Sequence, residues 1–412
     1  MKEQKGYDDL SKPFEYTNKH RRILWGAVFL MATSSIGPAF LTQTAVFTEQ
    51  FMASFAFAIL ASIIIDIGAQ INIWRVITVV GKGGQDIAND VFKGLGTFIA
   101  VLIAIGGLAF NIGNVAGAGL GLNAIFGIDV RIGAGITGVL AILIFIVRNA
   151  QKVVDIITQV LGVLMIAIVA YVMVLTKPPV MEAAQKMIVP DDINKLIVPI
   201  ITLVGGTVGG YITFAGAHRL LEAGITGKHY IPFVNRAAIS GILTTGVMRT
   251  FLFLAVLGVV VTGFTLNPDN PPASVFEHVL GPVGNQVFGV VLFAAALSSV
   301  IGCAYTSTTF IQSLHPSIKN HKNLVIILFI VISSIIFLTI GKPVKLLIIA
   351  GAMNGLILPV TLGTILIASR KKSIVGDYRH PTWMLVIGVI AVLTTLIAGV
   401  LSLQGLQDLW NN

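Results

Sequence analysis

The stretch LVGGTVGGYITFAG (residues 203–216) contains four glycines within six residues, inside an apolar run from about residue 193 to residue 217 that is long enough to cross a bilayer. Glycine weakens a helix by about 1 kcal/mol relative to alanine. In hydrocarbon, backbone groups must be hydrogen-bonded within the helix unless they line a protein cavity. The stretch therefore predicts a membrane helix that is interrupted at a binding site. The alternative interpretation is that the glycines only let a neighbouring helix pack closely.

The composition of the whole chain indicates a polytopic membrane protein. Of its 412 residues, 55% are hydrophobic and 11% are charged, which no soluble domain of this length would show. The net charge of +9 is explained by basic cytoplasmic loops rather than by nucleic-acid binding. The single cysteine, Cys303, excludes a disulfide framework and a cysteine metal cluster. A polar N-terminal segment of about twenty residues before a long apolar run predicts no cleaved signal peptide.

The hydropathy pattern predicts an all-α fold with eleven membrane spans. Their expected bounds are about 23–47, 52–73, 97–123, 131–147, 153–176, 193–217, 237–263, 284–310, 323–340, 345–369 and 383–403. With a cytoplasmic N-terminus, about 20 of the 27 Lys and Arg residues fall on cytoplasmic segments and about 6 on external ones, as the positive-inside rule requires. Eleven crossings then place the C-terminus outside a cell membrane.

The expected domain organisation follows from these spans. A cytoplasmic tail covers residues 1–22, and a single transporter domain covers residues 23–412. Within that domain we predict one five-helix repeat at about 23–176, a second at about 193–369, and an extra helix at 383–403.

The first span is also unusual for a lipid-facing helix. Gly37 and Pro38 can kink it, and its second half is polar, with Thr42, Gln43, Thr44, Thr48, Glu49 and Gln50. Spans one and six are five helices apart. Two interrupted helices at matching places in successive five-helix units indicate an inverted-repeat transporter with a site near the middle of the membrane.

The third span resembles a known family. NIGNVAGAGLGLNAIFGIDVRIGAGITG (residues 111–138) is similar to the third-to-fourth helix stretch of the Nramp family of divalent-metal transporters, where a small-residue run ends in GLNLLFGIPL. GPAFL (37–41) resembles the GPG start of the family's first helix, GGTVGGY (205–211) its sixth-helix ATVMPH, and ILPV (357–360) its tenth-helix LP element. The resemblance implies a LeuT-like five-plus-five inverted repeat with helices 1 and 6 interrupted.

The same comparison shows which functional groups the chain lacks. The family's metal-binding Asp-Pro-Gly-Asn falls on residues 48–51, its helix-six methionine on Gly209, and its Pro-His on Gly210 and Tyr211. The third-helix Asp and Glu, which serve proton transfer in the family, fall on Asn111 and Asn114. Glu49 is the one carboxylate left, and a single carboxylate is a poor cage for a dehydrated divalent ion. We therefore predict no metal site, no cofactor and no catalytic residues.

The chemistry of the altered site favours a small, polar organic anion. Half-helix N-termini offer partial positive charge and free N–H groups to a carboxylate, and glycines let the backbone approach it. The resemblance implies a narrower candidate, because Nramp-like bacterial proteins without the metal ligands are associated with 5-oxoproline (pyroglutamate) use. Interhelical hydrogen bonding is an equally good explanation of the Thr and Gln side chains. The predicted binding residues are Gln43, Thr44, Thr48, Glu49, Gln50, Gly205, Gly206, Thr207, Gly209, Gly210, Tyr211, Asn111, Asn114 and Asn354.

Six residues are candidates for coupling or gating: Glu49, Asp66, His218, Arg249, Ser298 and Ser299. A charge inside a span, such as Arg249, is a functional hypothesis by default; it could attract an anion or pair with Asp66, and snorkelling or a structural ion pair is the alternative. The two serines could form a sodium site or pack as ordinary serines. Glu49 and His218 are candidate proton carriers, although His218 could equally lie at a solvated helix end.

The sequence thus predicts a secondary-active importer that works by alternating access and carries 5-oxoproline or a similar small carboxylate, coupled to protons as the resemblance implies. The expected partners are this substrate, a coupling proton or sodium ion, and the lipid bilayer, with no nucleic acid and a monomeric state. The first alternative is a divalent-cation transporter for Mg²⁺ or Mn²⁺. An intramembrane enzyme is not expected, because neither HExxH nor GxSxG occurs and the histidines lie mostly at loops or helix ends.

Overall fold

The computed structural model describes residues 17–147, 150–312 and 314–411, so most of the predicted cytoplasmic tail (1–22) and the final residue lie outside the described part. The described residues form helices and three short 3-10 turns, without strands. The helices are α1 (Asn18–Ser35), α2 (Pro38–Phe51), α3 (Phe55–Val80), α4 (Gly84–Val91), α5 (Leu95–Phe126), α6 (Val130–Ile146), α7 (Ala150–Thr176), α8 (Val180–Lys186), α9 (Ile197–Thr207), α10 (Ile212–Glu222), α11 (Ile231–Val260), α12 (Pro271–Ile311), α13 (Pro316–Asn320), α14 (Lys322–Ile340), α15 (Pro343–Ala368), α16 (Lys372–Val375) and α17 (Thr382–Asn411).

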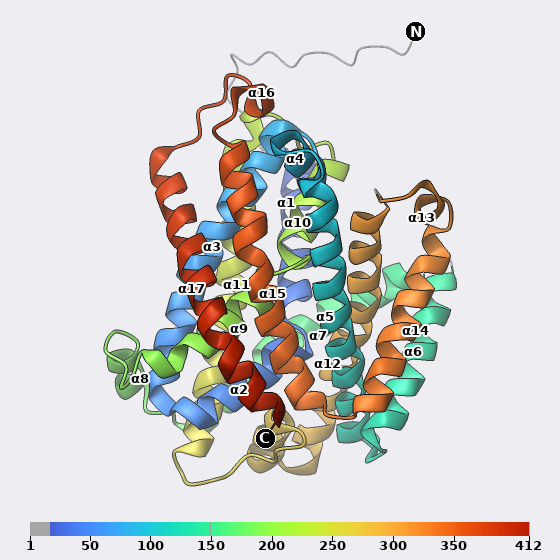
Figure 1. Ribbon diagram of the computed structural model, residues 1–412. Helices are drawn as coiled ribbons and strands as arrows, with labels where there is room; N and C mark the ends of the chain where they lie inside the picture. The colour runs from blue at the N-terminus through green and yellow to red at the C-terminus, as the bar shows by residue number, and fades with distance from the viewer. Residues whose placement is uncertain (1–16, 148–149, 313, 412) are drawn as a thin grey trace.

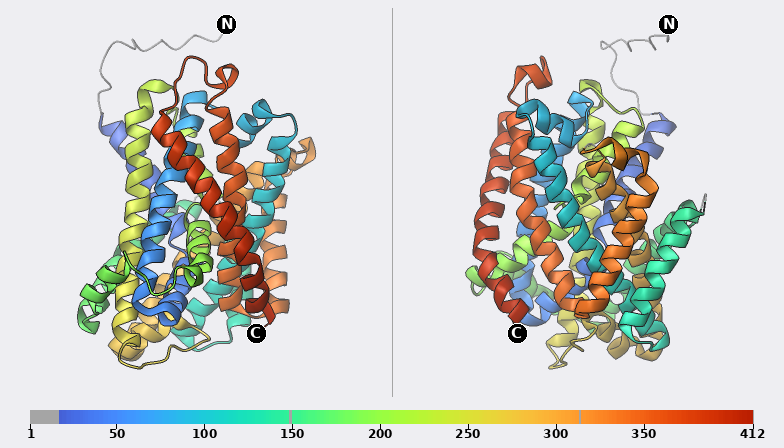
Figure 2. Two further views of the ribbon diagram at one scale, coloured as in Figure 1. Left: turned by 60° about the vertical axis from the view of Figure 1, so that its left-hand side comes forward. Right: turned by 45° about the vertical axis from the view of Figure 1, so that its right-hand side comes forward.

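The long helices stand side by side between two ends of the molecule (Figures 1 and 2). The short helices α4, α13 and α16 lie at one end, which the predicted orientation places in the cytoplasm, and α8 lies toward the other (Figure 1). Within the described residues, nine stretches are long and apolar enough to cross a membrane, and α6 is a shorter apolar helix. One stretch, Pro38–Val80, contains both α2 and α3. The predicted all-helical membrane fold is confirmed, whereas the number of eleven spans stays a prediction.

The first predicted span consists of two half-helices. Helix α1 ends at Ser35, and the chain passes through Ile36 (ψ 71°) and an extended Gly37 (φ −115°, ψ −172°) before α2 begins at Pro38. Proline is favoured at the first position of a helix, because its fixed φ suits the helix and its missing N–H would have no partner there. The predicted interruption at Gly37-Pro38 is therefore confirmed.

The glycine-rich stretch forms a second interruption. Helix α9 ends at Thr207, and α10 begins at Ile212. Between them Gly210 has φ +54°, a left-handed value that glycine adopts without steric strain. The half-helices α1 and α10 lie toward the α4 end of the molecule, and α2 and α9 lie toward the α8 end (Figure 1). The two interruptions therefore occur at a similar depth.

The glycines of this stretch serve different purposes. Gly205 and Gly209 face α15: an added Cβ would lie 1.8 Å from the carbonyl oxygen of Gly351 at Gly205, and 2.6 Å from that of Asn354 at Gly209. The close-packing interpretation therefore applies to these two. Gly206 instead faces the Gln43 side chain, whose Oε1 would lie 3.0 Å from an added Cβ.

A buried polar cluster attaches the start of α17 to α3. The His380 ring lies 2.7 Å from Asn72 Oδ1 through Nε2 and 3.1 Å from the Tyr378 hydroxyl through Nδ1. Arg75 donates from Nε to the same hydroxyl. Burial lowers the pKa of His380 to about 4, and the charges of Arg75 and Arg370 act in the same direction.

We predict that Gly205→Ala destabilises the protein by about 1–3 kcal/mol, because the added methyl group overpacks the contact between α9 and α15. The measurement is the thermal unfolding midpoint of detergent-purified protein. Gly363→Ala is the matched control, since no heavy atom lies within 4 Å of a Cβ added at this position on α15. Equal midpoints for the two variants would contradict the close packing.

We also predict that the protein loses stability as the pH falls from about 6.5 toward 4. The unfolded state binds a proton at His380 over this range and the folded state does not, so the contribution is fully present above the unfolded pKa of about 6.5 and is lost on acidification. His380→Gln should reduce the pH dependence of the unfolding midpoint over this interval. The same change at the exposed His278 should leave that dependence as it is, and an equal effect of both variants would contradict the assignment.

Candidate functional site

The two interruptions are joined by a hydrogen bond. The Ser35 hydroxyl, at the last residue of α1, donates to the backbone carbonyl of Thr207, the last residue of α9, over 3.0 Å. Two helix C-termini, which carry partial negative charge, therefore meet at this point. The N-termini of α2 and α10, which carry partial positive charge, begin a few residues farther along each chain segment.

The positive ends border a group of buried polar side chains from α5 and α12. A Cβ at Gly37 would lie 3.5 Å from the Ser299 hydroxyl and 3.8 Å from the amide oxygen of Asn114. Asn114 and Cys303 also lie near the Tyr211 hydroxyl, just before α10. Asn114 thus lies next to both interruptions.

Asn114 is fully buried, and apart from the neighbouring Tyr211 hydroxyl neither its Oδ1 nor its Nδ2 has a hydrogen-bond partner within the described residues. Buried amide groups are nearly always paired, so an unpaired one calls for a ligand, a water molecule or a functional role. Asn111, one turn earlier, instead donates to the Ser333 hydroxyl of α14 over 2.8 Å. The structure therefore separates the two asparagines: Asn111 bridges helices, and Asn114 faces the interruptions.

On the other side of α9, a buried charge pair touches the interruption. Arg249 of α11 donates from Nη1 to the Thr207 hydroxyl over 3.1 Å, and its guanidinium carbon lies 4.2 Å from the centre of the Phe40 ring. Asp66 of α3 interacts with both Arg249 and Thr207. Both charged residues are at least 98% buried, with exposed fractions of 1% for Asp66 and 2% for Arg249. The predicted neighbours Asp66 and Arg249 are thus brought into one cluster.

The second half of α2 lies away from this centre. Thr48 follows Pro38 by ten residues, which is about 15 Å along a helix. The Thr44 and Thr48 hydroxyls donate to carbonyls of their own helix, those of Phe40 and Thr44. Glu49 accepts from the backbone N–H of Leu266 over 2.7 Å, in the loop after α11.

This geometry corrects the placement of the family's helix-one motif. A motif that lines the interruption falls on residues 37–40, where the sequence reads Gly-Pro-Ala-Phe and shares the proline of Asp-Pro-Gly-Asn. The earlier placement on residues 48–51 is wrong, because these residues end α2 and begin the turn to α3. Ser35, Gly37 and Phe40 were missed as site residues. The Gly37-Pro38 pair was the signal that could have identified them.

The remaining predicted residues divide between the centre and its margins. Gln43 donates to the Leu347 carbonyl over 2.9 Å, and its Oε1 has no partner. Asn354 donates to the carbonyls of Gly106 and Ala350, and its unpaired Oδ1 abuts Gly210. No hydrogen bond of the Gln50 side chain occurs within the described residues, and Gln50 is exposed at the end of α2. Ser298 is half-buried beside the buried Ser299.

His218 is not at a solvated helix end. Its Nε2 accepts from the Gly84 backbone N–H over 3.4 Å, and its ring stacks on Phe310 at 5.3 Å between centroids. It therefore packs between α4 and α12, toward the α4 end of the molecule. The exposed Arg219 and Glu222 form an ion pair at 3.6 Å on the outer side of the same helix.

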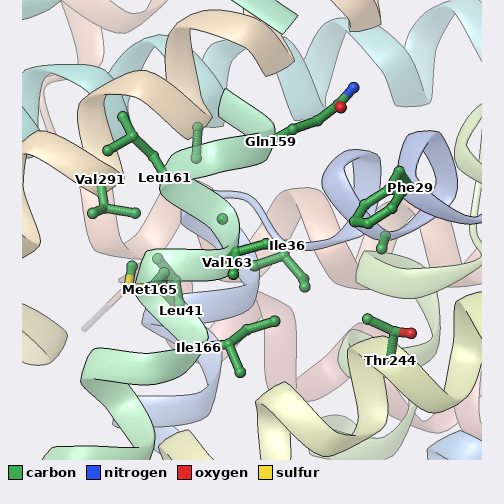
Figure 3. Close-up of a pocket in the computed structure, with 13 residues that line it drawn as sticks. Phe29, Ile36, Leu41, Gln159, Leu161, Val163, Met165, Ile166, Thr244 and Val291 are labelled. Carbon is green, nitrogen blue, oxygen red and sulfur yellow. The ribbon is translucent and has the colours of Figure 1, made fainter. Parts of the chain in front are cut away.

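An apolar cavity reaches the first interruption from the side of α7 (Figure 3). Its empty space amounts to about 600 Å³ when the part open to the outside is included, and Ile36 of the interruption lines it together with Leu41, Met165 and Val291. Gln159 and Thr244 are its polar lining residues. Because its walls are apolar, this cavity cannot itself recognise a charged cargo.

The donor set at the centre does not resemble a metal centre. Within the described residues, no group of three or more His, Cys, Asp or Glu side chains comes together. Besides Asp66, which interacts with the cation of Arg249, the polar groups at the interruptions are hydroxyls, amides, the Cys303 thiol and backbone groups. A single carboxylate among such groups is a weak ligand set for a dehydrated divalent ion.

Comparisons with known proteins agree with this architecture. The family described as natural resistance-associated macrophage protein-like (Nramp) matches residues 28–404. The uncharacterized membrane protein YcsG of Bacillus subtilis (strain 168) is 54% identical over 390 residues, which cover 94% of this chain and 96% of that protein.

Two solved structures share the fold at low sequence identity. The Eremococcus coleocola manganese transporter, in complex with an aromatic bis-isothiourea substituted compound, has a TM-score of 0.73 at 16% identity, covering 96% of this chain and 90% of that one. MhsT in complex with L-phenylalanine has a TM-score of 0.70 at 16% identity, covering 92% of this chain and 98% of that one.

Proposed function

Since this chain belongs to the Nramp family of transporters and has a LeuT-like fold, we propose that it is a secondary transporter that imports a small organic anion, 5-oxoproline or a similar small carboxylate. Alternating access takes place around the interruptions α1–α2 and α9–α10. The transporter domain spans residues 23–412, acts as a monomer, and is oriented in the cell membrane with a cytoplasmic N-terminus and an external C-terminus. Protons are the coupling ions, and sodium is the alternative.

The observation that carries the proposal is the unpaired amide of Asn114 beside Gly37 and Tyr211. A carboxamide offers one acceptor and two donors. The lactam edge of 5-oxoproline presents an N–H and a C=O side by side, so that it can form two parallel hydrogen bonds with such an amide. The carboxylate of the same molecule can then face the N-terminal amides of α2 or α10.

The charge at the centre argues against a cation as cargo. Arg249 touches both interruptions, through Thr207 and Phe40, whereas the carboxylate of Asp66 interacts with Thr207 and Arg249 on the side of α9, so the positive charge is the one that reaches α2. Two like charges separated by a few ångströms in a low-dielectric interior repel each other by several kcal/mol. The motif positions 37–40 hold Gly, Pro, Ala and Phe, which offer no side-chain ligand to a metal.

A divalent-cation transporter is the second candidate, because the manganese transporter of Eremococcus coleocola shares the fold and Asp66 supplies a buried carboxylate. The experiment that separates the two uses purified protein in proteoliposomes. Uptake of radiolabelled 5-oxoproline and of Mn²⁺ is measured in parallel, with protein-free liposomes as the background. Saturable uptake of 5-oxoproline without Mn²⁺ uptake supports the proposal, and the reverse pattern rejects it.

We predict that Gly37→Ala lowers 5-oxoproline uptake by about tenfold or more, equivalent to about 1.4 kcal/mol of binding free energy. The added methyl group fits without strain, because φ is −115° and its neighbours lie at ordinary contact distances, but it occupies the space beside Asn114 and Ser299. Gly26→Ala on the exposed side of α1 is the control, since no atom lies within 4 Å of its Cβ. Wild-type uptake by the Gly37 variant would remove this position from the site.

A further inference from the structure

The cluster of Asp66, Thr207 and Arg249 connects three helices at the second interruption. Asp66 comes from α3, Thr207 is the last residue of α9, and Arg249 comes from the middle of α11. A charge buried at this depth is costly, so membrane proteins keep it where it has a function or a close partner. The cluster is therefore a candidate for a role in the transport cycle.

Asp66 and Arg249 do not use all of their hydrogen-bonding atoms, as the two partners of a structural salt bridge would. Arg249 uses Nη1 for the Thr207 hydroxyl, while its Nε and Nη2 have no partner within the described residues. Both carboxylate oxygens of Asp66 also lack a close hydrogen-bond donor, because the hydroxyl of the neighbouring Thr207 donates to the Leu203 carbonyl. Strong Arg–carboxylate pairs usually form two parallel hydrogen bonds, and no ion-pair contact within 4 Å joins these two in the described chain. Each group has capacity for another partner.

We infer that Asp66 is the proton acceptor of the transport cycle, and that Arg249, which lies over Phe40 in the first turn of α2, binds the substrate carboxylate together with the α2 N-terminus while Asp66 is protonated. This inference rests on the proposed function and deepens it. On the outer side, a hydronium ion donates its proton to the Asp66 carboxylate, so that an O–H bond forms, a water molecule is left and Asp66 becomes neutral. The positive charge of Arg249 is then free to pair with the carboxylate of the incoming anion.

The transport cycle is completed on the inner side, where the anion and the proton are both released. The anion leaves, the Asp66 O–H bond breaks, and the proton passes to water. Arg249 again faces a negatively charged Asp66. One proton and one monovalent anion enter together, so the step carries no net charge across the membrane.

The hydrogen bonds of Thr207 explain how this exchange moves the helices. Its hydroxyl accepts from Arg249, and its backbone carbonyl accepts from Ser35 of α1. A change of partner at Arg249 therefore acts directly on the ends of α9 and α1. These are the two half-helix ends that must separate or rotate for the site to open to one side.

Within the described residues, the charged group that acts on Asp66 is Arg249 from α11, and Thr207 from α9 is the polar neighbour. The other helices packed against α3 are α2, α4, α8, α10, α15, α16 and α17. The titratable and charged side chains of the first six lie toward helix ends: Glu49, Asp86, Asp90, Glu182, Lys186, His218, Arg219, Glu222, Lys345 and Lys372. The protonation of Asp66 is thus set by the occupancy of Arg249.

The first test measures coupling in proteoliposomes with radiolabelled 5-oxoproline. An inward proton gradient should drive accumulation, and a potential imposed with potassium and valinomycin should leave the rate unchanged. At equilibrium, binding should tighten by about tenfold per pH unit of acidification while Asp66 titrates, because one proton is bound with each anion. Uptake that follows the potential, or that requires sodium, overturns the inference and leaves the anion-transport proposal standing.

The second test separates coupling from a purely structural ion pair. Asp66→Asn mimics the protonated state, so binding should lose its pH dependence and exchange should continue without gradient-driven accumulation. Arg249→Met should lose 5-oxoproline binding. Replacing both residues in one chain removes both buried charges, which is often neutral or stabilising for folding, so this variant remains informative if a single variant unfolds.

The double variant discriminates between the two roles. A structural pair predicts that it regains folding and proton-driven uptake together, which overturns the inference. Coupling predicts a folded protein, with a wild-type unfolding midpoint, that no longer accumulates 5-oxoproline. Glu182→Gln, an exposed carboxylate on α8, is the control that should keep proton-driven uptake. Mn²⁺ uptake by the wild type in the absence of 5-oxoproline uptake rejects the proposed function itself, and this inference with it.

Discussion

A backbone that leaves the helical conformation inside a membrane has to satisfy its amides and carbonyls without water, and the arrangement of this protein follows from that constraint. At the C-terminal end of α9, the carbonyl of Thr207 accepts a hydrogen bond from the side chain of Ser35, which lies at the C-terminal end of α1. Pro38 removes one N–H at the start of α2. The polar groups that still lack partners lie at the N-termini of α2 and α10 and on a few buried side chains. A polar cargo would bind at these groups.

The sequence was sufficient to predict the interruptions, because glycine and proline act through local backbone energetics. It was not sufficient to align them with a family motif. The GPAFL segment was matched to the start of a helix, which moved the metal-binding motif to residues 48–51, whereas the structure has the interruption at Gly37. A proline occurs in both the family's GPG and its Asp-Pro-Gly-Asn, so a short match could not decide between them. The position of α2 relative to α9 in the folded protein is what decides how the family's Asp-Pro-Gly-Asn motif aligns with this chain.

The sequence alone also could not assign different roles to polar side chains that lie one helical turn apart. Asn111 and Asn114 share a helix face, and both were expected to line the site or to bridge helices. The structure pairs Asn111 with Ser333, and it places Asn114 beside Gly37 and the Tyr211 hydroxyl. Likewise, a charge in the middle of a span identified Arg249 as unusual, but its neighbours come from α2, α3 and α9, which meet only in the folded protein. Local patterns identify functional helices, and tertiary contacts assign their residues.

The charges at the interruptions offer a physical account of the proposed difference in cargo between transporters that share this fold. The C-terminal ends of α1 and α9 present partial negative charge at the middle of the membrane, and a cation is the natural partner for them. Here the guanidinium of Arg249 lies at the end of α9, so the protein supplies that positive charge itself. A mobile cation is then disfavoured at the same place, and the positive N-terminal ends of α2 and α10 are left without an anion. An organic carboxylate would complete the arrangement that a metal and its carboxylate ligand would complete in a cation transporter.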